Sequence, residues 1–215
     1  MSRPVLSRVE DRAHPARLDR DRGLVEEARL DPSRFDALYR KYLAQVYSYA
    51  YYELQDHHAA EDATERVFMQ ALAGLPRFEE RVDAFIASGE GSSGAADSAD
   101  FSTFRVWLFR IARNVVANER RRDRRRQVSS LEDAAELSAP DNVVDTATAR
   151  EAASAAWEAV SRLPEDRRRA VILRFVDEMS TAEIAAILGR SEGAVRVLLH
   201  RALRAVADDL RGRLS

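Results

Sequence analysis

The sequence predicts an all-α protein in which a flexible acidic linker joins two small helical domains. Apolar residues recur at intervals of three and four over most of the 215 residues, a period typical of amphipathic helices. Only 8 residues are glycine, and no segment sustains the alternation of apolar and polar residues that a half-buried strand needs. Charge lies in separate blocks along the chain, which indicates separate surfaces for separate partners.

Composition excludes several classes of protein. The chain has no cysteine, so it contains neither disulfides nor thiolate metal sites. No apolar run approaches the ~20 residues that cross a bilayer. Residues 1–22 are rich in arginine and aspartate and lack the apolar stretch of a secretory signal. We therefore expect a cytoplasmic protein without membrane insertion.

The first domain is expected at residues 31–126, after a charged and partly disordered N-terminal extension at residues 1–30. Asp31, Pro32 and Ser33 are typical of a helix start, and an apolar stripe at helical spacing follows them. A second stripe ends at Pro76, which cannot continue a helix, and a third begins at Phe104. Three such helices can bury a shared core.

Two segments interrupt this helical pattern. Residues 79–103 are rich in glycine, serine, alanine and aspartate, and such a composition buries too little apolar surface to order itself. We expect a long loop there. Residues 127–149 are acidic and contain Pro140, and they are expected to form the linker between the domains.

The second domain is expected at residues 150–215, with four short helices. The first ends at Pro164, and the others are expected at residues 170–176, 181–188 and 192–210.

The last two helices of this domain fit a helix-turn-helix. Ala185 supplies the small residue where the helices cross, Gly189 can adopt the left-handed turn, and Val195 is a buried residue of the second helix. Ser191 is a suitable N-cap. Glu192, Arg196, His200 and Arg204 would share one face of the second helix, flanked by Arg190 and Arg201. Arginine can read guanine or clamp a phosphate in the major groove.

The third helix of the first domain is strongly basic. Nine arginines and two acids lie between Arg105 and Arg126. Arg110, Asn114 and Asn118 recur every four residues, so they lie along one stripe. Arginine and asparagine can contact phosphates and bases, although a solvated surface would have the same composition.

Taken in order, these segments resemble a known family. AEDATERVF at residues 60–68, LPRF at 75–78 and FRVWLFRIARN at 104–114 resemble region 2 of the extracytoplasmic-function (ECF) sigma factors of the sigma-70 family. Leu163-Pro164, VILRF at residues 171–175 and LHRA at 199–202 resemble their region 4. The resemblance implies an alternative sigma factor that binds core RNA polymerase, recognises the minus-10 and minus-35 promoter elements and promotes strand opening.

The resemblance also assigns roles to residues. The helix near Asp62 would bind the β′ clamp coiled coil, and the second domain would meet the β flap. The residues implied in binding the polymerase core are Asp62, Glu65, Arg66, Phe68 and Met69. Those implied in minus-10 binding, with Phe101 to Thr103 around a flipped base, are Phe101, Ser102, Thr103, Arg110, Arg113, Asn114, Asn118, Arg121 and Arg122. Those implied in minus-35 binding are Arg168, Arg190, Ser191, Glu192, Arg196, Val197, His200, Arg201 and Arg204.

The resemblance further implies promoter DNA and an anti-sigma factor as partners, with no cofactor, metal or catalytic residue. The chain departs from the family at Glu65 and Arg66, where Gln-Glu is usual, and its long loop exceeds the usual length.

Two alternatives stay open at this point. A stand-alone helix-turn-helix regulator would bind duplex DNA without acting as a polymerase subunit. An enzyme would need a site such as His57, His58, Glu61 and Asp62, but the sequence offers no second ligand cluster. We therefore expect no enzymatic activity.

Overall fold

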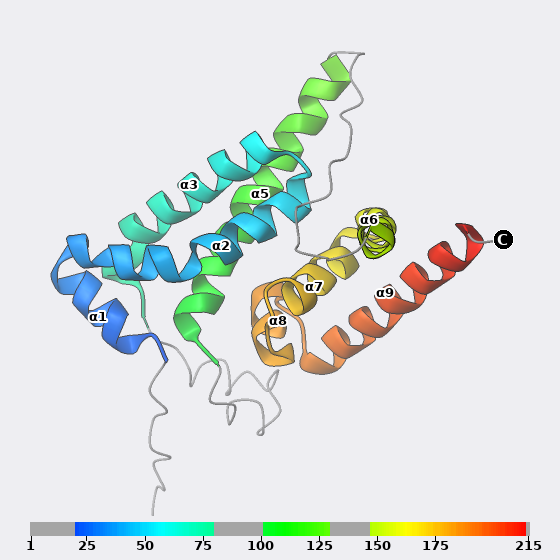
Figure 1. The fold of residues 1–215 in the computed structure, drawn as a ribbon. Helices are drawn as coiled ribbons and strands as arrows, with labels where there is room; N and C mark the ends of the chain where they lie inside the picture. The colour runs from blue at the N-terminus through cyan, green and yellow to red at the C-terminus, as the bar shows by residue number, and fades with distance from the viewer. Residues whose placement is uncertain (1–19, 80–100, 130–146, 214–215) are drawn as a thin grey trace, which may run out of the picture.

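The computed structural model describes residues 20–79, 101–129 and 147–213, and its regular secondary structure in these ranges is helical throughout (Figure 1). The first group of helices comprises α1 (Arg22–Leu30), η1 (Pro32–Arg34), α2 (Phe35–Leu54), α3 (His57–Gly74), η2 (Leu75–Arg77) and α5 (Thr103–Ser129). The second comprises α6 (Ala147–Ser161), α7 (Glu165–Phe175), α8 (Thr181–Leu188) and α9 (Glu192–Arg213). The predicted all-α class with two helical domains is confirmed.

The first domain is built on α2, α3 and α5, the three helices that the apolar stripes predict. The Asp31 side chain accepts a hydrogen bond from the Ser33 amide (3.0 Å) just before α2. Asp56 caps α3 in the same way, accepting from the Ala59 amide (2.6 Å). Such caps satisfy amides that have no partner within the helix. Fully buried side chains from the three helices, among them Tyr42 and Phe104, form the core.

Helix α1 corrects the prediction for the N-terminal extension. Residues 22–30 are helical, and Val25 and Ala28 are buried. The Arg29 guanidinium donates to the carbonyl oxygens of Leu75 (3.2 Å) and Pro76 (3.3 Å). The first domain therefore includes α1, while residues 1–19 lie outside the described residues.

The predicted helix-turn-helix is present in α8 and α9. Gly189 has φ of +65°, the left-handed conformation that glycine adopts without a steric penalty. The Ser191 hydroxyl accepts from the Ala194 amide (3.2 Å), as expected of an N-cap. At the start of α8, Ser180 and Glu183 form a reciprocal capping box.

The two domains pack against each other. Figure 1 shows α7 and α8 facing α2 and α5, and buried apolar residues from both groups form one continuous cluster. Tyr52 of α2 packs on Trp157 of α6 with 4.0 Å between ring centroids. Most of the predicted loop and linker, at residues 80–100 and 130–146, lies outside the described residues. None of the described helices is both long and apolar enough to span a bilayer.

Candidate nucleic-acid interface

One face of α9 presents side chains to solvent. Five of the nine residues predicted for minus-35 contact are exposed on this helix: Arg196, Val197, His200, Arg201 and Arg204. Glu192, also predicted as a contact, is instead 5% exposed, and its carboxylate pairs with Arg196 (2.8 Å). An acid in the first turn is stabilised by the positive end of the helix. Glu192 therefore orients Arg196 rather than facing DNA.

Of the three other residues predicted for minus-35 contact, two are exposed and one is buried. Ser191 and Arg190 are exposed, and Arg190 pairs with Asp166 (2.7 Å). Arg168 is only 7% exposed. Its guanidinium donates to Glu53 of α2 and to the Leu163 carbonyl oxygen, both at 3.3 Å. The prediction that Arg168 contacts DNA is not compatible with this burial, because α7 turns that side chain into the domain interface.

The polar stripe of α5 is exposed over its C-terminal half. Asn114, Asn118, Arg121 and Arg122 are all accessible. The side-chain oxygen Oδ1 of Asn118 accepts from Arg121 (2.7 Å), and Arg122 pairs with Glu119 (2.9 Å). These contacts are local to the helix, so the stripe offers amide and guanidinium groups to a partner.

Nearer the start of α5, two predicted minus-10 residues are engaged by α8. Arg110 donates to the Ala186 carbonyl oxygen from Nε (2.9 Å) and Nη2 (2.7 Å), and Arg113 donates to that of Ile187 (2.6 Å). The last carbonyls of a helix have no intrahelical donors and carry partial negative charge. They therefore attract cationic side chains.

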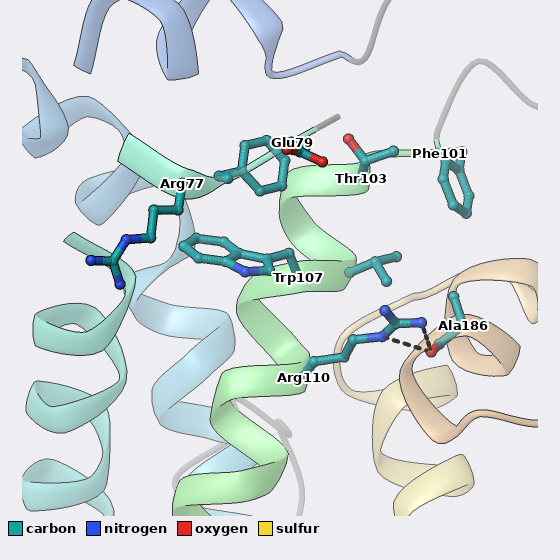
Figure 2. A pocket seen from close by; sticks show the side chains of 9 residues that line it. Arg77, Glu79, Phe101, Thr103, Trp107, Arg110 and Ala186 are labelled. Carbon is teal, nitrogen blue, oxygen red and sulfur yellow. Dashed lines mark hydrogen bonds between the residues drawn. The ribbon is translucent and has the colours of Figure 1, made fainter. Parts of the chain in front are cut away.

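A cavity of about 310 Å³ lies beside this contact (Figure 2). Its walls come from η2 and the two residues after it, from α5 and the segment just before it, and from α8. The residues are Arg77, Phe78, Glu79, Phe101, Thr103, Val106, Trp107, Arg110 and Ala186. Phe101 and Thr103 thus line a pocket, and their contact with a flipped base stays a prediction. Ser102 does not line it, because its side chain is fully buried and its hydroxyl donates to Asp21 (2.5 Å). The prediction for Ser102 is corrected accordingly.

The predicted polymerase-binding helix borders an apolar groove of about 380 Å³ between α2 and α3. Met69 is 64% exposed there, and the exposed Glu65 also lines the groove. Asp62 is exposed on the same helix but does not line the groove. Phe68 is buried and packs edge-on against Tyr39, with 4.7 Å between ring centroids. It forms the floor of the groove rather than its rim.

Arg66 occupies the position at which the chain departs from the family pattern. Its guanidinium pairs with Glu119 of α5 and with Asp62 one turn away (3.5 Å). The reversed charge therefore ties α3 to α5.

Buried charges at the domain interface escaped the sequence analysis. Glu53 of α2 is fully buried and pairs with Arg120 (3.0 Å) and Arg168 (3.3 Å). Burial raises the pKa of Glu53, and the charges of Arg168 and Arg169 partly offset that rise. Asp177 is 1% exposed, and neither carboxylate oxygen has a hydrogen-bond partner among the described residues. Burial raises the pKa of Asp177 well above its usual range, against the opposing charge of Arg105.

The histidines considered as metal ligands have other contacts. His57 Nδ1 lies 2.8 Å from the Tyr47 hydroxyl, and its ring packs on Tyr51. Within the described ranges, no three His, Cys, Asp or Glu side chains gather as a metal site would require.

Comparison with known protein families agrees with this geometry. The family model described as Sigma-70 region 2 matches residues 38–87, and that described as Sigma-70, region 4 matches residues 154–206. The first covers most of α2 and all of α3, the two helices that border the apolar groove, and the second covers the helix-turn-helix. A stand-alone regulator is not favoured, because both regions are present in the family's order.

Individual relatives support the same family, and a solved structure shares the fold. The chain is 34% identical to ECF RNA polymerase sigma factor BldN of Streptomyces coelicolor over 198 residues, covering 87% of this chain and 66% of BldN. It is 33% identical to ECF RNA polymerase sigma factor SigF of Caulobacter vibrioides over 145 residues, covering 67% of this chain and 77% of SigF. CnrH, solved in complex with the cytosolic domain of CnrY, shares the fold with a TM-score of 0.61 at 21% identity, over 89% of this chain and 97% of that one. The chain therefore belongs to the ECF RNA polymerase sigma factors of the sigma-70 family.

Proposed function

We propose that this sigma factor binds core RNA polymerase through α3, recognises the minus-35 element with α9 and recognises and helps to open the minus-10 element with α5. One observation carries the proposal: a region-2 match and a region-4 match lie on domains whose exposed polar faces are those expected to meet DNA. Such a subunit acts where the polymerase acts, in the cytoplasm, and has no enzymatic activity of its own.

Docking on the polymerase is assigned to the groove between α2 and α3. An exposed methionine above an aromatic floor suits an apolar partner helix. The acids Glu61 and Glu65, which line the groove, suit a basic surface such as the β′ clamp coiled coil would supply, and Asp62 adds an exposed acid on the same helix. An anti-sigma factor would compete with the polymerase for this groove, and the second domain would meet the β flap.

The direct test of the proposal is transcription with purified core polymerase. Adding the protein should produce transcripts whose start sites share two upstream elements. Glu65→Arg should weaken assembly, because it reverses an exposed charge at the rim of the groove. Gln70→Arg, on the neighbouring exposed position of α3, is the control for added charge. If pull-down of core polymerase is equal for wild type and Glu65→Arg, the docking face is wrongly assigned.

Base reading by α9 has its own test. Arg196→Ala and Arg201→Ala remove exposed guanidinium groups from the outer face of the helix. A base-reading arginine should cost about 1–3 kcal/mol and relax preference at one position, whereas a phosphate contact weakens all sequences alike. Selection of promoters from a randomised upstream element distinguishes the two. Arg211→Ala, in the last turn of α9, is the control, and a loss of equal size there would contradict the assignment.

A further inference from the structure

A methionine side chain lies open to solvent in the groove between α2 and α3, the proposed polymerase-docking site. Met69 is 64% exposed, although Phe68 and Leu72 lie beside it in the apolar lining of the groove. All of the lining residues belong to α2 and α3, which run side by side (Figure 1). The thioether is therefore accessible at the place that an apolar partner would cover.

The chain holds few other sulfur atoms that compete for an oxidant. It has no cysteine and 3 methionines. Met179, in the turn between α7 and α8, is fully buried, and Met1 lies outside the described residues. A buried sulfur reacts only when the structure around it opens, because the oxidant has to reach it. Within the described ranges, an oxidant that attacks sulfur therefore meets Met69 first.

The reaction of this thioether with hydrogen peroxide is a two-electron oxidation. The sulfur attacks one peroxide oxygen, the O–O bond breaks, and that oxygen stays on the sulfur as methionine sulfoxide. The other oxygen leaves as water with both protons of the peroxide. Methionine sulfoxide reductases reverse the change. In the reverse reaction a dithiol is oxidised to a disulfide, and the sulfoxide oxygen leaves as water.

Oxidation places a polar oxygen in an apolar part of the groove. The sulfoxide oxygen is a hydrogen-bond acceptor, and so are the carboxylates of Glu61 and Glu65, which line the same groove. Thr64, another lining residue, already donates its hydroxyl to the Ala60 carbonyl oxygen (2.7 Å). An apolar partner that covered the sulfoxide would therefore bury a polar group without returning a hydrogen bond, and such burial opposes binding.

We propose that Met69 is an oxidation site that controls docking on the polymerase. Peroxide converts Met69 to the sulfoxide, the oxidised subunit binds core polymerase more weakly, and a sulfoxide reductase restores binding. The free subunit is the form that reacts, because a partner in the groove covers the sulfur. The effect on docking rests on the proposed function, whereas the preferential oxidation of Met69 does not.

Peptide mapping tests the reactivity of Met69 without polymerase. The full chain is treated with hydrogen peroxide, catalase removes the excess, and mass spectrometry measures the oxygen gained by each methionine-containing peptide. The peptide of Met69 should be oxidised roughly tenfold or more faster than that of Met179. In urea the two rates should converge, since unfolding exposes both side chains. Equal rates in the folded chain would overturn the proposal.

Pull-down of untreated core polymerase measures the effect on docking. The oxidised subunit, freed of peroxide, should bind roughly tenfold more weakly than the untreated subunit, because docking then buries a polar group. Incubation with a dithiol and the reductases for the two sulfoxide epimers should restore the affinity. Circular dichroism checks that the oxidised chain keeps its helices.

Two substitutions locate the effect. Met69→Leu removes the reactive sulfur, so peroxide should leave its affinity equal to that of its own untreated sample. Met179→Leu changes a buried methionine outside the groove and should lose affinity on oxidation as wild type does. A loss of affinity in oxidised Met69→Leu would assign the effect to another residue and contradict the proposal, as would oxidised wild type that binds like untreated wild type.

Failure of the proposed function gives a different result. If untreated wild type does not bind core polymerase, the assigned docking site is wrong, and control of docking by Met69 is wrong with it. The peptide map still decides whether Met69 is the preferred oxidation site.

Discussion

The carboxyl group of Asp177, which follows α7, is buried beside charged and polar groups from two helices. Arg105 of α5 and Tyr49 of α2 both interact electrostatically with it, yet it has no hydrogen bond within the described ranges. A buried polar group without a partner costs about 1–3 kcal/mol. Asp177 therefore weakens the packing of the two domains at neutral pH.

Asp177→Asn should raise the free energy of unfolding at neutral pH, because the neutral amide avoids burying a charge, by about 1.4 kcal/mol for each pH unit by which the native pKa exceeds the ordinary one. The raised pKa of Asp177 means that the native state holds its proton to higher pH than the unfolded chain does. Between the ordinary pKa of about 3.9 and the raised native pKa, the free energy of unfolding of wild type therefore falls as the pH rises. Below the ordinary pKa, Asp177 is protonated in both states, so the advantage of the variant should vanish there. Urea unfolding at several pH values measures the difference in free energy of unfolding between wild type and variant. Asp36→Asn, at an exposed surface pair, should show no such trend, and an equal trend in both variants would contradict the prediction.

Single residues also mark where sequence reasoning stops. Arg105 and Arg110 stand in one arginine-rich helix, and nothing local distinguishes the buried side chain from the exposed one. The partner of Arg105, Glu183, lies 78 positions along the chain. The SxxE spacing of Ser180 and Glu183 predicts a capping box, so the local role of Glu183 could have been found from the sequence. Its long-range role could not.

At the scale of helices, the turn between α8 and α9 depends on one backbone conformation. Gly189→Ala should destabilise the second domain by about 1–2 kcal/mol, because a left-handed φ crowds Cβ against the carbonyl oxygen. Space is not the cause, since a Cβ there meets nothing within 4 Å. Gly193→Ala is the matched control, at an equally open position inside α9, where alanine should stabilise by about 0.5–1 kcal/mol. Thermal unfolding of both variants measures the difference, and equal shifts would show that the turn tolerates a side chain.

Helices with long apolar stripes were predictable, and α1 was not. The stripes that predict α2, α3 and α5 recur over several turns, and the bounds predicted for α8 agree with the structure. Helix α1 has 9 residues and only two of them, Val25 and Ala28, are buried. So short an amphipathic segment is barely stable alone, and its order comes from packing on α2 and from the bonds that Arg29 makes beyond α3. Such contacts lie outside any local window of sequence.

For the whole molecule, the shared core predicts how the chain unfolds. Apolar residues of both domains belong to one cluster, so separating the domains exposes surface that each would otherwise bury. Calorimetry should show a single transition whose calorimetric and van't Hoff enthalpies agree. Arg105→Met should divide it into two transitions, because the domains then unfold separately. Two transitions in the unmodified chain would mean that the domains are thermodynamically independent.

The guanidinium groups of Arg110 and Arg113 and the end of α8 that they contact belong to one polypeptide. An inhibitor on a separate chain can be outnumbered when a cell makes more of its target. An intramolecular contact instead has a fixed effective concentration, so dilution and overproduction leave the fraction of molecules that make this contact unchanged. Only a ligand that binds molecules without the contact more tightly can alter that fraction.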